Sequence, residues 1–362
     1  MKKIFTVIAL LVSLTATAQK RADRVNLQAE GASTMILFGD TQAYLKYDIN
    51  QPILDLMTAW VGDNVQHLNI KAVLCTGDVV DRNDSDYINP KKQNQNSSEM
   101  WKSLSRSLER LDGKVPFIST LGNHDYGYRG SENYNTNYPD VVTFDRNSTY
   151  RDCLVAEYPN RAGRSSLENA AFRFELPGWE RKVLVICTEF CPCEGAVEWA
   201  RDLITSKKYK DDVVIYLTHS YLVERTAERM DYEDRFWISN RETGNYCGKD
   251  LWDKLFSKVD NIRLVLCGHT GKPTGDLEDS VAWRVDRNDS GKNVYQMMFN
   301  CQMLGGGWQG NGGDGWLRIL EFMPDGKTVS VRTYSPLFGI SPATKDMAYR
   351  TAPYDQFEFV IE

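Results

Sequence analysis

The chain has 362 residues, of which 42% are hydrophobic and 25% charged, so it has the apolar share of a globular protein rather than a disordered one. Its 43 basic and 49 acidic residues give a net charge of −6, which argues against a general binder of nucleic acid or of anionic membranes. A small anionic substrate bound through metal ions is compatible with this charge.

The first 18 residues have the three parts of a secretory signal peptide. Lys2 and Lys3 form a positive start, residues 4–14 are apolar, and residues 16–18 (Ala-Thr-Ala) match a cleavage site. The apolar run is too short to span a bilayer, and no later window is apolar enough to do so. We therefore expect export to the periplasm or the medium, and a mature chain, 19–362, with a net charge of −8.

From residue 33 onward, short apolar runs typical of buried strands alternate with helical patterns. Strands are expected at 33–38, 72–75, 115–119, 172–176, 183–188, 213–217 and 262–267. Helices are expected at about 50–68, 100–111, 196–204 and 251–259. After about residue 281 the helical pattern stops, and β-rich runs follow at 294–299, 316–322 and 328–334.

No Pro/Ser-rich linker divides the mature chain, so we interpret 19–362 as a single domain. Residues 126–150 show no periodicity and are expected to form a surface insertion that could cap a site. Residues from about 281 to 362 form its β-rich C-terminal part.

Four of the eight cysteines lie in apolar runs and are expected to be buried thiols: Cys75, Cys187, Cys267 and Cys301. The other four lie in polar segments and could pair in an oxidising compartment: Cys153, Cys191, Cys193 and Cys247. Four cysteines allow three pairings, and the sequence does not choose among them. The Cys191-Pro192-Cys193 motif has no second Cys/His pair nearby, so it is a weak zinc signal.

Polar side chains follow the expected strands where each strand ends. Because the carboxyl ends of parallel strands meet at one edge of a sheet, these side chains should lie close together. Imidazoles mixed with hard oxygen donors suit Mn, Fe or Zn. Each residue alone has an ordinary structural explanation, and only the joint pattern indicates a metal site. The residues concerned are Asp40, Gln42, Asp78, Asp81, Asn123, His124, His219 and His269.

These residues fall into motifs in a fixed order: Gly39-Asp40-x-Gln42, Gly77-Asp78-x-x-Asp81-Arg82-Asn83, Gly122-Asn123-His124-Asp125, His219 and Gly268-His269. The pattern resembles the calcineurin-like metallophosphoesterase family. Its Asp-x-Gln first motif and its tail at 312–320 resemble the secreted bacterial branch of that family. The resemblance implies an α/β fold in four layers, with two mixed β-sheets packed as a sandwich and flanked by helices.

The resemblance also implies an exported metal-dependent phosphoesterase that hydrolyses a phosphate monoester or diester by attack of metal-activated water. Two divalent ions (Mn, Fe or Zn) are expected. Asp40 and Gln42 would bind the first ion, and Asp78 would bridge both. Asn123, His219 and His269 would complete the coordination of the second ion.

Three further residues are expected to act on the substrate. His124 would serve as general acid or stabilise the phosphate, since protonation of a poor leaving group is worth roughly 10²–10⁴-fold in rate. Asp81 would orient and charge-stabilise His124, and Arg82 would contact the phosphate.

The first metal position departs from the family pattern. Gly271 stands where family members usually have the last histidine of Gly-His-x-His, and Gln42 replaces another. Only oxygen donors remain, which predicts a harder, weaker site that favours Mn or Mg or is often empty. Gln302, after a late strand, is a candidate further ligand.

Other functions are compatible with the same residues. A depleted first site would also suit a catalytically weak or inactive protein that binds a phosphorylated or glycan ligand. An exported nuclease-like phosphodiesterase is disfavoured for long nucleic acids by the negative charge. The glycine-rich run 305–313 is expected to be a flexible turn rather than a phosphate loop. Substrate, oligomeric state and metal identity are not readable.

Overall fold

The computed structural model describes residues 24–89, 91–128 and 130–362. The expected signal peptide at 1–18 lies outside the described residues. Two seven-stranded sheets form the body of the molecule, and both mix parallel and antiparallel pairs.

The first sheet has the strand order β13-β12-β11-β1-β2-β3, and β14 also pairs with β12. Its parallel part is β1, β2 and β3, whereas β11 runs antiparallel to β1. The strand bounds are β1 Ser33–Phe38, β2 Ile70–Cys75, β3 Phe117–Ser119, β11 Leu317–Phe322, β12 Thr328–Tyr334, β13 Tyr349–Arg350 and β14 Phe357–Val360.

The second sheet has the order β4-β5-β6-β7-β8-β10-β9. Strands β6, β7, β8 and β10 are parallel neighbours in that order. The bounds are β4 Leu154–Glu157, β5 Ala170–Phe174, β6 Val183–Cys187, β7 Val213–Leu217, β8 Ile262–Cys267, β9 Val281–Arg287 and β10 Asn293–Phe299.

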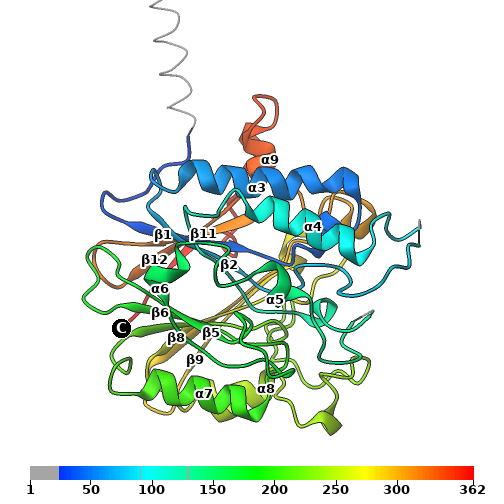
Figure 1. The fold of residues 1–362 in the computed structure, drawn as a ribbon. Coiled ribbons are helices and arrows are strands. Elements are labelled where there is room, and N and C mark those ends of the chain that lie inside the picture. Colours follow the sequence, from blue (N-terminus) through cyan, green and yellow to red (C-terminus); the bar gives the residue numbers. More distant parts are fainter. Residues whose placement is uncertain (1–23, 90, 129) are drawn as a thin grey trace, which may run out of the picture.

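Helices cover the outer faces of both sheets. Figure 1 shows α3 and α4 above the first sheet and α7 and α8 below the second, which gives the expected four-layer α/β sandwich. The α-helices are α2 Gln42–Leu45, α3 Gln51–Asn64, α4 Ser97–Leu108, α5 Tyr138–Val141, α6 Tyr150–Cys153, α7 Glu194–Thr205, α8 Gly248–Leu251 and α9 Pro336–Gly339. A π-helical turn, η4 Trp252–Phe256, continues α8. The 3₁₀ helices are η1 Asp48–Asn50, η2 Asn123–Asp125, η3 Arg241–Thr243, η5 Leu277–Ser280, η6 Gly307–Gln309 and η7 Lys345–Met347.

Local sequence accounts for these elements. Pro52 lies in the first turn of α3, where its missing N–H removes no helical bond. A capping box between Asn96 and Glu99 begins α4. Strand β7 is apolar along its length, and β8 is apolar apart from Arg263, because helices or the other sheet cover both faces of these strands.

Burial differs among the aromatic residues of segment 126–150 and of the glycine-rich run. Tyr126 and Tyr138 are buried in the core, whereas Tyr128 and Trp308 are exposed. The eight cysteines, all within the described ranges, are free thiols. Among the described helices, none is long and apolar enough to cross a bilayer.

Candidate metal centre

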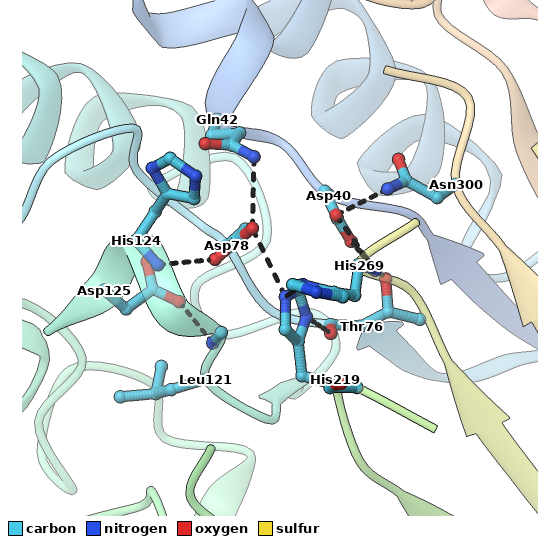
Figure 2. A network of polar contacts seen from close by, with 12 residues as sticks. Asp40, Gln42, Thr76, Asp78, Leu121, His124, Asp125, His219, His269 and Asn300 are labelled. Atoms are coloured by element: carbon cyan, nitrogen blue, oxygen red, sulfur yellow. Dashed lines mark hydrogen bonds and ion pairs between the residues drawn. The ribbon is translucent and has the colours of Figure 1, made fainter. Parts of the chain in front are cut away.

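The ends of strands from both sheets converge on one polar cluster (Figure 2). Asp40 and Asp78 follow β1 and β2 of the first sheet, and η2 after β3 carries Asn123 and His124. From the second sheet, His219 follows β7 and His269 follows β8. The structure thus brings together residues up to 229 positions apart, since the backbone N–H of His269 donates to Asp40.

Ligand atoms of Asp78, His219 and His269 all lie within 4.8 Å of one another. His219 is fully buried, and its Nδ1 lies 2.7 Å from the carbonyl oxygen of Thr76, to which it donates. Its Nε2 is therefore directed to Asp78 Oδ2, at 3.3 Å. This tautomer leaves the Nε2 lone pair available for a cation.

His269 is held in the matching orientation by an acidic residue. Its Nε2 lies 2.8 Å from Glu233 Oε2, and its Nδ1 lies 3.1 Å from His219 Nε2. With Nε2 donating to Glu233, the Nδ1 lone pair faces that of His219. Two facing lone pairs need a proton or a cation between them, and a shared divalent ion meets that need.

Asn123 lies next to the cluster in the chain, since the backbone N–H of the following residue, His124, donates to Asp78. Asn123 is buried, and its Oδ1 has no hydrogen-bond partner within the described part of the chain. A buried unpaired carbonyl costs about 1–3 kcal/mol, and a ligand bound by the Asn123 oxygen would remove that cost. Asp78, Asn123, His219 and His269 together offer two nitrogens and two oxygens, a donor set suited to Mn, Fe or Zn.

Backbone conformation brings these ligands close. Gly77 has a φ of +100°, and a Cβ there would lie 2.7 Å from His219 Nδ1. Asp78 and His269 themselves adopt positive φ values of 46° and 74°. Non-glycine residues in this region are strained, and such strain clusters at functional sites.

The charges of the polar cluster suit a bound cation. Burial opposes ionisation of Asp78, but the His219 imidazole favours it and the pKa of Asp78 lies below its ordinary value. Burial disfavours the charged form of His219, yet Asp78 and then Asp40 raise the pKa of His219 to about 10. Burial also raises the pKa of Asp40 well above its ordinary value. In the ion-free protein, a proton on His219 therefore occupies the place that a cation would take.

His124 lies beside this cluster, on the same side of Asp78 as Gln42 (Figure 2). Its backbone N–H donates to Asp78 Oδ1 at 2.8 Å, and its ring Nδ1 lies 2.7 Å from the backbone oxygen of Asp81. The Asp81 carboxylate is farther from that ring nitrogen, at 3.8 Å. The backbone carbonyl of Asp81, more than its carboxylate, thus orients the ring.

The Asp81 carboxylate instead binds Lys46. Lys46 Nζ lies 2.9 Å from Asp81 Oδ1 and 4.4 Å from the centre of the Trp308 ring. Arg82 lies 3.8 Å from Asp81 Oδ2 and keeps part of its side chain exposed. Lys46 and Arg82 therefore put two positive charges next to His124.

Asp40 and Gln42 are placed near Asp78 but are engaged with amides. Gln42 Nε2 donates to Asp78 Oδ2 at 3.1 Å and to Gln302 Oε1 at 2.8 Å. Asp40 Oδ2 accepts from Asn300 Nδ2 at 2.6 Å and from Gln302 Nε2 at 3.1 Å. The first position is thus a network of amides around a carboxylate, whereas the second has two imidazole nitrogens that face each other.

Sequence reasoning missed Glu233, Lys46 and Asn300. Asn300 directly follows β10, so the strand-end rule that found Asp40 and His219 could have found it. Lys46 lies one helical turn after Gln42, a spacing that places both on one helix face. Glu233 lies in a segment without periodicity, where no signal points to it.

A sandwich of two mixed sheets with this cluster at the strand ends defines a metal-dependent hydrolase fold. The family model for calcineurin-like phosphoesterases matches residues 34–273, so the chain belongs to the calcineurin-like phosphoesterase family. The fold class expected from the sequence is confirmed by this match and by the two mixed sheets.

Individual relatives are more distant. The "Uncharacterized protein YvnB" of Bacillus subtilis (strain 168) is 28% identical over 314 residues, covering 85% of this chain and 20% of that protein. The chain thus spans about a fifth of the length of this curated relative.

Solved structures with a similar fold include GAP50, the anchor in the inner membrane complex of Plasmodium, at 12% identity and a TM-score of 0.45, covering 92% of this chain and 90% of GAP50. PhoD matches at 11% identity and a TM-score of 0.42, covering 91% of this chain and 73% of PhoD. The sulfate thiohydrolase SoxB of Thermus thermophilus matches at 14% identity and a TM-score of 0.40, covering 86% of this chain and 58% of SoxB.

Proposed function

We propose that the protein is an exported phosphoesterase that hydrolyses a small phosphate monoester or diester with a divalent ion at Asp78, Asn123, His219 and His269. The observation that carries the proposal is the convergence of Asp78, His219 and His269, whose ligand atoms lie within 4.8 Å of one another. The buried, unpaired oxygen of Asn123, in the residue before His124, supports it as a fourth ligand. When bound, the ion supplies charge neutralisation of the phosphate and a water nucleophile at neutral pH. The family resemblance further predicts an ion at Asp40 and Gln42, where only oxygen donors are available.

The chain's own residues supply the rest of the chemistry. Because His124 Nδ1 donates to the Asp81 carbonyl, its Nε2 remains free to deliver a proton to the leaving oxygen. Lys46 and Arg82 place positive charge beside His124, where they favour an anionic substrate. Water attacks the phosphorus directly in this proposal, so no covalent enzyme intermediate forms.

The proposed partner is a small phosphorylated molecule. The net charge of −6 does not favour long nucleic acids. Support for the organic part of a substrate comes from exposed aromatic rings on Tyr128, Trp237 and Trp308, which could stack on it. Export is proposed on the signal peptide pattern alone.

The proposal predicts metal-dependent turnover of p-nitrophenyl phosphate or of its bis ester. The mature protein would be stripped of metal, then supplied with Mn²⁺, Zn²⁺, Fe²⁺ or Mg²⁺ in turn. Asp78→Asn should lose turnover by at least about 10²-fold, because the charge that holds the ion is removed. The preferred ester then distinguishes a monoesterase from a diesterase.

Asp140→Asn is a matched control, since it removes a carboxylate that pairs with Arg164 on the surface. Its turnover should equal that of the parent protein. A folded parent protein that binds phosphate esters without hydrolysing them under any metal would favour the binding-protein alternative.

A further inference from the structure

We infer that the carboxamide of Gln302 takes the place of the first divalent ion, so that this centre binds a single ion, at Asp78, Asn123, His219 and His269. The inference rests on the proposed function, because it concerns how many ions the proposed metal centre holds. The hydrogen bonds around Asp40 support it.

Asp40 Oδ2 has no acceptor capacity left for an ion. It receives three donors: the His269 N–H at 3.1 Å, Asn300 Nδ2 at 2.6 Å and Gln302 Nε2 at 3.1 Å, and Oδ1 accepts from the Thr76 hydroxyl at 3.0 Å. Each carboxylate oxygen offers about two lone-pair sites. Because Asp40 is buried, these donors compensate its loss of water, and a cation at Oδ2 would have to displace at least one of them.

The orientations of both amides are fixed by neighbours that can only donate. The Trp308 indole N–H donates to Gln302 Oε1 at 3.1 Å, so that oxygen faces Trp308 and Nε2 faces Asp40. The backbone N–H of Gln302 donates to Asn300 Oδ1 at 3.2 Å, which turns Asn300 Nδ2 toward Asp40. Rotating either amide to offer its oxygen to a cation would set two donors against each other.

Gln302 also connects the two residues that should share the first ion. Its Nε2 donates to Asp40, and its Oε1 accepts from Gln42 Nε2, which in turn donates to Asp78. The amide thus forms, through neutral hydrogen bonds, the link that an ion forms in a two-ion centre. The carbonyl oxygen of Gln42 points away from Asp40 (Figure 2), and it is buried without a partner in the described structure.

The chain has room for a larger residue at Gly271. The family resemblance places the last histidine here, and a Cβ at Gly271 would make only ordinary contacts, the nearest at 3.5 Å to Met303 Cγ. Its φ lies outside the left-handed region. Space therefore does not exclude a Cβ at 271, and the variant Gly271→His adds the imidazole that the family resemblance places there.

The test counts ions directly. The full protein would be stripped, loaded with excess Mn²⁺ and passed through gel filtration, and its Mn content and EPR spectrum measured. We expect one Mn²⁺ per chain with the spectrum of an isolated ion. Two Mn²⁺ per chain with exchange coupling, as expected for ions about 3.5–4 Å apart, would overturn the inference. A chain that retains no Mn²⁺ would contradict the proposed function itself.

Variants test whether Gln302 is what excludes the first ion. The double variant Gly271→His with Gln302→Glu adds an imidazole and a carboxylate, and it should bind two Mn²⁺ ions with a coupled spectrum. Gly271→Ala with Gln302→Met adds no ligand and should stay at one. Gly271→His alone keeps the amide and should also stay at one, and it serves if the double variant does not fold. A coupled pair in Gly271→His alone, or a folded double variant with one ion, would overturn the role of Gln302.

Discussion

The backbone and the side chain of His124 have different roles. Its N–H holds Asp78 in place, whereas its ring is held by the Asp81 carbonyl and leaves Nε2 free. His124→Ala keeps the backbone contact and removes only the ring, so the variant should retain its metal.

We predict that His124→Ala lowers kcat about 10²–10⁴-fold for an alkyl phosphate. The loss should be much smaller for p-nitrophenyl phosphate, because nitrophenolate departs without protonation. Parallel assays of the two esters, with metal content measured alongside, check this. Equal losses for both esters would assign His124 to phosphate stabilisation instead of proton donation.

Glu233 acts on the metal centre through His269. The bond from His269 Nε2 to Glu233 directs Nδ1 toward His219, and the pKa of Glu233 falls to about 2 because the His269 contacts outweigh the effect of its burial. A carboxylate behind a ligating imidazole fixes the ring and strengthens it as a donor.

Glu233→Ala should therefore weaken Mn²⁺ binding about 10–100-fold. Glu233→Gln should lose less, since its amide oxygen still accepts from Nε2. A competition titration against a chelator measures both. Equal affinity in all three proteins would show that the ring is held without Glu233.

At the scale of elements, the loops after the strands are packed too closely for extra atoms. A Cβ on Gly122, between β3 and η2, would press on Asp78 Oδ1 and on His219 Nε2, which belong to two of the proposed ligands. Neither atom belongs to a flexible exposed side chain, because both residues are buried.

Gly122→Ala should thus reduce Mn²⁺ affinity at least about tenfold, as expected when ligands are displaced. Gly271→Ala is the matched control, since its Cβ meets only ordinary contacts. The same chelator titration compares the two variants with the parent. Loss of binding in both would point to general disruption of the loops.

The sequence predicts several of the buried strands well. The bounds of β1, β7, β8 and β12 match the expected runs, because these strands are buried on both faces and end abruptly at polar loops. Strand β9 is not among the expected strands; Val281–Arg287 lies at the edge of the second sheet, where three apolar residues are followed by a half-exposed charged stretch. Strand β13 has two residues and leaves no pattern.

The same contrast applies to the candidate site. The proposed ligands follow strands, so the strand-end rule places them at one edge of the sheets, and the family resemblance assigns their roles. The residues that hydrogen-bond to those ligands and to Asp40 come from other segments. Glu233 lies in an irregular loop, Gln302 in the turn after β10, and Trp308 in η6. Their contacts depend on tertiary packing between parts of the chain that no local pattern relates.

For the whole molecule, the proposed ion joins the two sheets. Asp78 and Asn123 come from the loops of the first sheet, and His219 and His269 from those of the second. An ion held by all four stabilises only the folded chain, because the unfolded chain does not assemble the ligands. At 100 times its Kd, a bound ligand adds about 2.7 kcal/mol to the free energy of unfolding.

This stabilisation should depend on pH with a definite sign. Despite its burial, His219 has its pKa raised from 6.5 to about 10 in the ion-free protein, chiefly by Asp78. The protonated imidazole therefore stabilises the ion-free fold fully below pH 6.5, and that contribution is lost as the pH rises toward 10. Since the ion needs the neutral ring, its binding releases this proton, and the affinity for the ion should rise about tenfold per pH unit between pH 6.5 and 10.

Melting curves at pH 6.5, 7.5 and 8.5, with and without a fixed excess of Mn²⁺, should show a difference in Tm that widens with pH. In Asp78→Asn, which lacks the charge that raises the pKa of His219 and holds the ion, the difference should be absent throughout. A gap that narrows with rising pH in the parent protein would mean that His219 keeps its proton and is not a ligand.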